Sequence, residues 1–411
     1  MKVNLFFTIF WMLYIPTCIT FYHVINFQYI DEILTLILLL YTSGVVLNRK
    51  TKTIGKEVWA YTGVMAFYVL YSVMIHLTSI NAIVYDFQQQ IRPYIVFYCT
   101  YMLAPKLTSS QKRLLLVFLI LNLLVFFTVA ITMKSANLQV QQNPVVGQAC
   151  LLSGLLYYFY SKENSINFMV AVGIVALGLF SEKAKFFGEF VAFVGVLFFM
   201  KSKFRLSSVK TILMVIVVAV ISISLTWTKF NIYYVEGMQA SQKEIQARPA
   251  SYRTAATIVF KDYVPFGSGL GTFANASVIV YYSPLYYKYN LDKVWGLGTG
   301  AGFIADAFYP NLAQYGIVGL FLFFWFWRRR YLDLNKLNGL KNYRVALMCI
   351  AALLLESVAD SSYLSGKGMG YFLLLATSLT SEQRRINRKS RRIIIINRRL
   401  TGIENSFHEQ E

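Results

Sequence analysis

Long apolar runs without charge are the feature that most constrains this chain of 411 residues. Hydrophobic residues make up 57% of the chain and charged residues only 14%, against about 25% charged in an average globular protein. Several runs reach about 17 residues or more, which is the length that an α-helix needs to cross a bilayer. The sequence therefore predicts an all-α polytopic membrane protein and argues against a soluble, disordered or collagenous chain.

Apolar runs bounded by charged residues predict about twelve membrane-spanning helices. We place these spans approximately at 3–21, 33–47, 57–79, 91–105, 114–133, 145–160, 166–181, 186–200, 211–227, 307–327, 345–360 and 368–381. If the N-terminus lies inside, alternate connections and the tail hold about two thirds of the 39 lysines and arginines, the bias typical of cytoplasmic loops. Both termini are therefore predicted to be cytoplasmic. The net charge of +20 reflects this bias, so we expect no nucleic-acid partner.

One outward-facing connection, 228–305, is far longer than the others. Loops without structure rarely exceed about 15 residues unless they are functional. We therefore predict four regions: nine spans within 1–227, a loop domain with an interfacial helix at 228–305, three spans within 306–381, and a basic cytoplasmic tail at 382–411. The chemistry is expected in the loop domain, and the tail is expected to lie on membrane lipids.

Within 228–305, Pro249 stands where a helix can begin, and Pro265 and Gly267 stand where it can end. Apolar residues recur between them at the spacing of one helical face: Tyr252, Ala255, Ala256, Val259, Phe260 and Tyr263. Arg248 and Arg253 lie near the start of this helix. Its free backbone N–H groups and two guanidinium groups are therefore expected to converge on a phosphate or pyrophosphate. Alternatively, both arginines reach toward lipid headgroups.

The stretch YYSPLYYKYN lies between two glycine-rich stretches, GSGLG and GLGTGAG. The glycines predict turns, because no βαβ context supports a dinucleotide site. The rings of Tyr281 and Tyr282 could stack on sugar faces, and we place Tyr309 with them as a glycan-binding candidate. The alternative for clustered tyrosines is an interfacial aromatic belt.

Ionisable residues inside spans cost on the order of 2.5 to 3.5 kcal/mol each, so each needs a partner or a wet cavity. Here they lie near the outer ends of their predicted helices. We therefore expect a polar, outward-opening cavity beneath the long loop, with these lining candidates: Arg92, Lys183, Lys185, Glu189, Arg248, Arg253, Asp306, Glu356 and Asp360. Asp306, just before Pro310, is either a general base or a helix cap. For every one of these residues, an internal ion pair is the alternative.

The four cysteines are scattered through apolar segments, and the three histidines form no cluster with them. Such cysteines behave as small core hydrophobes. We therefore expect no metal site, no structural disulfide and no cofactor.

Three stretches, in this order, resemble the bacterial O-antigen polymerase and O-antigen ligase superfamily of metal-independent glycosyltransferases. FSEKAKFFGEF looks like the family's Ser-x-x-Arg or Ser-x-x-Lys helix start. ARPASYRTAATIVFKDYVPFGSGLGTF resembles its arginine-bearing outer helix, which is followed by P-x-G-x-G. DAFYPNLAQYGIVGLFLFF resembles its acceptor-side motif, which runs into a glycine-rich helix. Each motif is loose, so the resemblance depends on their order and on the predicted topology.

The resemblance implies that Arg248 or Arg253 binds the pyrophosphate of an undecaprenyl-linked donor, and Lys183 and Lys185 stand where relatives often have arginine. From the expected cavity we add Arg92 as a further pyrophosphate-binding candidate, and we place Asp306, Arg253 and Glu189 as the catalytic candidates. Ligase members carry a catalytic histidine where this chain has Asp306, which favours the polymerase branch.

The expected activity is therefore the joining of undecaprenyl-pyrophosphate-linked oligosaccharide repeats at the periplasmic face of the bacterial inner membrane. The expected partners are this lipid-linked oligosaccharide, membrane lipids and a chain-length regulator protein. An O-antigen ligase and a lipid-linked oligosaccharide flippase or transporter are the alternatives.

Overall fold

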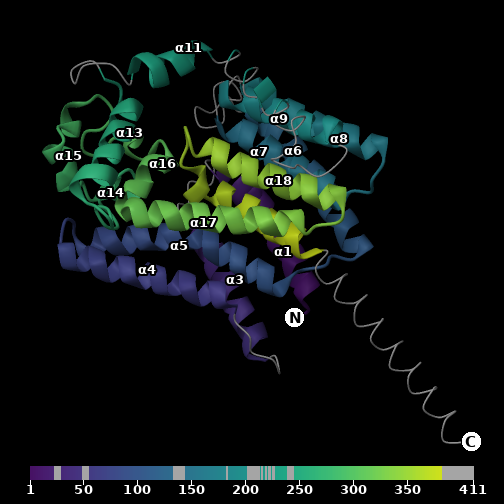
Figure 1. Ribbon diagram of the computed structural model, residues 1–411. Helices are drawn as coiled ribbons and strands as arrows, with labels where there is room; N and C mark the ends of the chain where they lie inside the picture. The colour runs from purple at the N-terminus through teal and green to yellow at the C-terminus, as the bar shows by residue number, and fades with distance from the viewer. Residues whose placement is uncertain are drawn as a thin grey trace, which may run out of the picture.

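The computed structural model describes residues 1–22, 29–48, 55–132, 144–181, 184–200, 227–237 and 245–381, together with five single positions between 213 and 224. Helices make up most of this part of the chain, and it contains no β-strand (Figure 1). The all-α prediction is confirmed for these residues. Most of the predicted ninth span, Lys183 and the basic tail lie outside them.

Within the described residues, four helical segments are long and apolar enough to cross a membrane. They are Val3–Thr20, which joins α1 (Val3–Tyr14) to the π-helix η1 (Ile15–Thr20), α3 (Ile30–Leu47), α4 (Lys56–Ile75), and Ser109–Val129 within α6 (Ser109–Thr132). In α4 only 17% of the most apolar window is buried. A surface so apolar is typical of a helix that faces lipid. The remaining predicted spans stay a prediction.

The helix at 366–381 lies at the centre of the largest hydrophobic core. Nearly all of its residues are buried, because small and apolar side chains cover all of its faces. Around it pack α1, α5 (Ile80–Leu103), α7 (Pro144–Tyr160), α9 (Ala184–Phe199) and α18 (Leu340–Glu356). The shorter α8 (Ser165–Leu177) and its extension η2 (Gly178–Ser181) pack on α7.

Helix α5 begins much earlier than the predicted span at 91–105, so that boundary was wrong. Ser79 caps the helix, and its Oγ accepts a hydrogen bond from the Ala82 N–H at 3.3 Å. The first half is too polar to be recognised as a span, but its polar groups have partners inside the protein. The Gln90 side chain donates to Asp86 Oδ1 at 3.0 Å and to Asn311 Oδ1 at 2.9 Å.

The segment 245–305 forms a group of short helices with a hydrophobic core of its own, packed over one end of α5 (Figure 1). Its elements are α13 (Ala247–Thr257), η4 (Ile258–Asp262), α14 (Ala276–Val280), α15 (Pro284–Lys288), η5 (Leu291–Lys293) and η6 (Gly302–Ala305). The short helices α11 (Trp227–Phe230) and η3 (Asn231–Glu236) precede it. The predicted helix at Pro249 is present, whereas the four-region division stays a prediction.

The P-x-G-x-G stretch packs directly on the backbone of the next helical segment. Gly267 adopts φ +80°, and a Cβ there would lie 2.3 Å from the Gly316 nitrogen, so no larger side chain fits. The Gly269 N–H donates to the Gln314 carbonyl at 2.9 Å, and the Val318 N–H donates to that of Pro265 at 3.2 Å. This close contact fixes segment 245–305 against the helix that follows.

The span predicted at 307–327 is not one continuous helix. It starts with two single turns, α16 (Phe308–Asn311) and η7 (Leu312–Tyr315), and the long helix α17 (Gly316–Asn335) begins only at Gly316, which adopts φ +60°. After α17 and α18, the connection at 357–365 contains the short helix η8 (Ser362–Leu364) and leads into the helix at 366–381.

Candidate functional site

The 357–365 connection is the place where the predicted polar residues meet. From α13, Arg248 Nη2 donates to the Ala359 carbonyl at 3.4 Å and the Tyr252 hydroxyl donates to that of Val358 at 2.7 Å. From α5, Arg92 Nη2 donates to the carbonyl of Leu364. At the start of α16, the Phe308 and Tyr309 N–H groups donate to the Ser357 carbonyl at 3.2 and 3.3 Å. Elements that are distant in sequence thus share one short connection, whose importance the sequence analysis missed.

Arg248 and Asp306 form an ion pair beside this connection. Arg248 donates through Nε to Asp306 Oδ2 at 2.9 Å and through Nη2 to the same oxygen. The two side chains are 16% and 27% exposed, so solvent still reaches the pair. Burial raises the pKa of Asp306 above its usual range, and the charge of Arg248 only partly opposes this rise. The alternative role as a helix cap is not supported, because α16 has Ala307 at its N-cap and no side-chain cap.

Arg253 lies on another side of α13. Five helical positions separate it from Arg248, which corresponds to about 140° around the helix axis. Arg253 is exposed, whereas Arg248 is half-buried toward Asp306. The helix geometry therefore does not support convergence of both guanidinium groups on one phosphate, and Arg248 is the arginine of α13 that contacts the rest of the site.

Near the Arg248–Asp306 pair, a network of acids and cations joins four helices. Lys185 of α9 forms an ion pair with Asp360. The Gln148 amide, from α7, donates to Glu356 Oε2 at 2.7 Å and to Asp360 Oδ2 at 3.2 Å. Lys367, at the start of the last helix, donates to Gln148 Oε1 at 2.7 Å. We refer to Gln148, Lys185, Glu356, Asp360 and Lys367 as the inner network.

Gln148 and Lys367 were not among the sequence candidates. Gln148 is neutral and lies in an apolar run, and Lys367 lies in a glycine-rich stretch that could have been a loop. The sequence signal that could have indicated them is the cost of burying a polar side chain in a span. This cost implies that each such side chain has a partner. The sequence alone does not give that partner, because it comes from a different helix.

Glu189 lies one turn after Lys185 on α9 and is 4% exposed. Its Oε2 atom has no hydrogen-bond partner within the described residues. Its carboxylate lies within electrostatic range of Glu356, Lys185 and Asp360. Glu189 is therefore an acid at the edge of the inner network, and its catalytic role stays a prediction.

Arg92 forms the internal ion pair that the sequence left open as the alternative to pyrophosphate binding. Its Nη1 atom contacts Asp31 Oδ2 and lies 2.9 Å from Glu32 Oε1, and its side chain is only 6% exposed. Together with its bond to the Leu364 carbonyl, this ties α3 and α5 to the 357–365 connection. Arg92 thus holds the connection near its end at Leu364, whereas Arg248 contacts it at Ala359.

The three predicted glycan-binding tyrosines lie in different surroundings. The Tyr282 hydroxyl donates to the Leu297 carbonyl at 2.7 Å inside segment 245–305, and the Tyr309 hydroxyl donates to that of Leu354 at 2.7 Å. Tyr281 is half-buried, with its ring centroid 6.5 Å from that of Tyr85. Tyr282 and Tyr309 therefore have packing roles, and glycan binding by the three stays a prediction. In the described part of the chain, no three His, Cys, Asp or Glu residues are grouped so as to hold a metal ion.

No family model matches this chain, and a search of curated proteins gives no match either. In the described residues the fold is all-α, and four helical segments are long and apolar enough to cross a membrane. Carboxylates and cations from several helices meet at one connection, next to a group of short helices, and this arrangement defines the class of protein.

Proposed function

We propose that this protein is a surface-polysaccharide polymerase of the O-antigen polymerase type, with twelve spans and both termini in the cytoplasm of a bacterium. It would join undecaprenyl-pyrophosphate-linked oligosaccharide repeats at the periplasmic face of the inner membrane, as a metal-independent glycosyltransferase. The observation that carries the proposal is the Arg248–Asp306 ion pair, where segment 245–305 meets the helical bundle.

The pair supplies the two groups that such a reaction needs. An acceptor hydroxyl oxygen forms a bond to the anomeric carbon of the donor while the bond from that carbon to the pyrophosphate oxygen breaks. The Arg248 guanidinium stabilises the negative charge that develops on the pyrophosphate. The Asp306 carboxylate accepts the proton of the hydroxyl, and its raised pKa makes it a better base than an ordinary aspartate.

In the structure these two groups neutralise each other, so the substrate must separate them. A pyrophosphate carries more negative charge than a carboxylate and offers more oxygens to a guanidinium fork. Its arrival at Arg248 would displace Asp306 and leave that carboxylate next to the bound donor. The ion pair is therefore the resting form of the site in this proposal, and donor binding prepares the base.

The inner network positions the site in this proposal. Through Asp360 and Glu356 it holds the 357–365 connection, whose Ala359 carbonyl contacts Arg248. Glu189 is proposed as a further catalytic acid, because it is buried with an unpaired oxygen near these groups.

The test uses the purified full-length protein in proteoliposomes with a defined lipid-linked repeat, without added metal or nucleotide sugar. The product is expected to be a ladder of lipid-linked oligomers. Arg248→Ala should slow elongation by about 100-fold or more, since removing one charge donor of this kind has that effect. The matched control is Lys261→Ala, which removes an exposed cation from the same segment.

Elongation by Arg248→Ala at the parental rate would refute the proposal. The ladder assay also separates the alternatives. Transfer of finished glycan to a different acceptor without a ladder would indicate a ligase. Movement of the lipid-linked repeat across the bilayer without elongation would indicate a transporter.

A further inference from the structure

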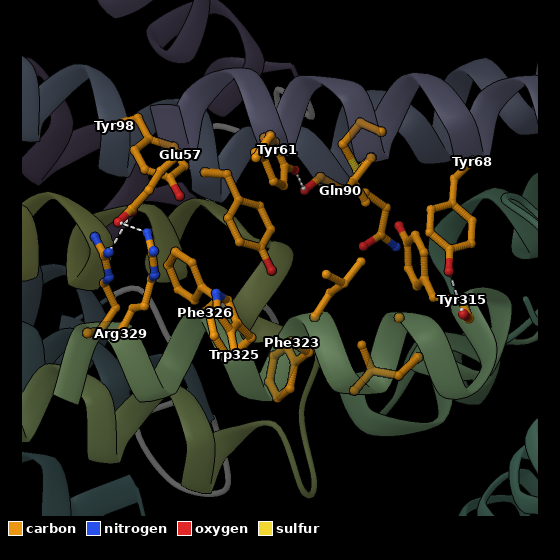
Figure 2. Close-up of a pocket in the computed structure, with 18 of the residues that line it drawn as sticks. Glu57, Tyr61, Tyr68, Gln90, Tyr98, Tyr315, Phe323, Trp325, Phe326 and Arg329 are labelled. Atoms are coloured by element: carbon orange, nitrogen blue, oxygen red, sulfur yellow. Dashed lines mark hydrogen bonds and ion pairs between the residues drawn. The ribbon is translucent and has the colours of Figure 1, made fainter. Parts of the chain in front are cut away.

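A groove runs between α4, α5 and α17 (Figure 2). Its volume is about 320 Å³. Most of its lining side chains recur three or four positions apart, so each helix presents one face to the groove. These residues include Glu57, Tyr61, Val64, Met65 and Tyr68 of α4, Gln90, Tyr94 and Tyr98 of α5, and Gly319, Phe323, Phe326 and Arg330 of α17.

One end of the groove is basic. Arg329 and Arg330 both contact the carboxylate of Glu57, and Arg330 lies 2.7 Å from its Oε2 atom (Figure 2). Asp333 also pairs with Arg330, at 3.3 Å. Lys56 also lines this end and is exposed, and the exposed Arg328 lies next to it, 5.6 Å from the ring centroid of the lining residue Trp325. Among the described residues these four cations outnumber the two carboxylates, and Lys336, which lies 2.9 Å from Asp333, adds to the excess of positive charge.

Two tryptophans indicate that this basic end lies at a membrane surface. Trp59 is 63% exposed and Trp325 is 43% exposed. The guanidinium groups of Arg328 and Arg329 lie 5.6 and 5.8 Å from the Trp325 ring centroid. Exposed tryptophans next to arginines are typical of the headgroup level of a bilayer.

The other end of the groove is closed. There the Tyr68 hydroxyl donates to the Tyr315 carbonyl at 2.7 Å (Figure 2). Twelve helical positions separate Lys56 from Tyr68, so the groove extends about 18 Å along α4. The hydrocarbon core of a bilayer is about 30 Å thick, so the groove is as long as one leaflet and a little more.

We propose that this groove binds one anionic phospholipid, with its phosphate at Lys56 and Arg329 and one acyl chain between α4 and α17. The basic end selects the anionic headgroup, and the closed, aromatic-lined end accommodates a chain of one leaflet. This lipid site does not depend on the proposed enzyme activity.

The lipid would also stabilise the candidate site, through residues that lie between the groove and the 357–365 connection. Phe308 lines the groove, and its ring stacks on Tyr363 with the centroids 4.1 Å apart. Tyr363 belongs to the 357–365 connection. The same connection contacts Arg248 through the Ala359 carbonyl. An acyl chain in the groove would therefore pack against the wall that separates the groove from the site.

The test measures lipid retention and thermal stability of the full-length protein after delipidation in detergent. Native mass spectrometry should show one retained phosphatidylglycerol, and saturating phosphatidylglycerol should raise the melting temperature by roughly 5 °C. Phosphatidylcholine with the same acyl chains should give less than half of this shift.

Two pairs of substitutions on α4 test where the chain binds. Ala60→Phe with Val64→Phe fills the groove and should abolish both retention and the shift. Ala66→Phe with Val73→Phe is the matched control, because these exposed positions of α4 lie outside the groove. The surface substitutions Lys56→Gln and Arg329→Gln test the headgroup without altering the interior, and should remove the preference for phosphatidylglycerol.

Three results would overturn the proposal. The first is an equal shift with phosphatidylcholine, and the second is a full response in the groove-filling variant. The third is displacement of phosphatidylglycerol by undecaprenyl phosphate at lower concentration, which would make the groove a polyprenyl site. None of these measurements involves elongation, so their failure is distinct from failure of the proposed function.

Discussion

Two aspartate–lysine pairs in this protein have very different surroundings. At the surface of segment 245–305, Lys288 Nζ lies 3.5 Å from Asp262 Oδ2, and its side chain is 49% exposed. In the inner network, Asp360 pairs with Lys185 and also accepts hydrogen bonds from Gln148 and from the Ser362 N–H. The same two residue types therefore form a surface pair that also bonds two tyrosines in one case, and one link of a network among helices in the other. Removing a partner should therefore lower the stability less in the first case than in the second.

The largest effect on stability is expected from Glu356, which is 2% exposed and accepts from Gln148 and Ser362. Glu356→Ala removes the acceptor of the Ser362 hydroxyl and one of the two carboxylates to which Gln148 donates, inside the buried network. Unfolding in detergent micelles should show a loss of about 3 kcal/mol or more in the free energy of unfolding. The control is Leu355→Ala, at a 53% exposed position of the same helix. Equal losses of unfolding free energy in the two variants would mean that the inner network contributes no more to stability than an exposed apolar side chain does.

The next effect concerns activity and involves Asp306. Asp306→Asn should slow elongation by about 100-fold, the lower range for loss of a general base.

In the parent protein, elongation should fall as the pH drops through the pKa of Asp306, because only the carboxylate accepts a proton. Burial raises this pKa, so the fall should occur at a higher pH than for a free aspartate. Arg248→Ala should move it higher still. A pH–rate profile of each variant checks these directions, and an unchanged profile in Asp306→Asn would exclude this residue as the base.

A smaller effect is expected from Lys185, whose side chain is 22% exposed. Lys185→Met removes the charge but retains much of the length of the side chain, and Asp360 retains its bonds to Gln148 and the Ser362 N–H. The free energy of unfolding should fall by about 1 kcal/mol, since solvent screens a partly exposed pair. Thermal unfolding of Lys185→Met and of the surface variant Lys288→Met should be measured together, because Lys288→Met should lose less stability. A larger loss of stability in Lys288→Met would contradict this prediction.

The smallest effect is expected from Asp262, which is exposed. A hydrogen bond from the Tyr289 hydroxyl at 2.6 Å and the nearby Lys288 lower the pKa of this carboxyl. A lowered folded-state pKa gives stability that is present above the unfolded-state pKa and lost as the pH falls through the folded-state value. Asp262→Asn should therefore lower the melting temperature slightly at neutral pH. The difference should disappear at pH values below the usual aspartate pKa of about 3.9. A difference that grows on acidification would contradict this account.

The sequence was sufficient for features that depend on local patterns. The all-α class follows from apolar runs, and the helix at Pro249 follows from its proline, its apolar face and the Pro265–Gly267 stop. The start of α5 and the break before α17 were missed. In both cases the backbone depends on partners from other segments, such as Asn311 for Gln90 and the Pro265 stretch for Gly316.

The site was only partly predictable for the same reason. The free-energy cost of placing a charged side chain in a membrane span correctly indicated that Lys185, Glu356 and Asp360 need partners. It did not indicate that Gln148 and Lys367 would join them, or that Arg92 would be held by Asp31 and Glu32. Pairings between helices depend on the tertiary arrangement, which a single sequence does not specify.

Binding of a short-chain polyprenyl pyrophosphate to the purified protein tests the central claim most directly, namely that pyrophosphate replaces Asp306 at Arg248. The parent protein should bind it, Arg248→Ala should bind about 100-fold more weakly, and Asp306→Asn should bind more tightly because no carboxylate competes for the guanidinium. Unchanged affinity in Arg248→Ala, or weaker binding in Asp306→Asn, would contradict the account.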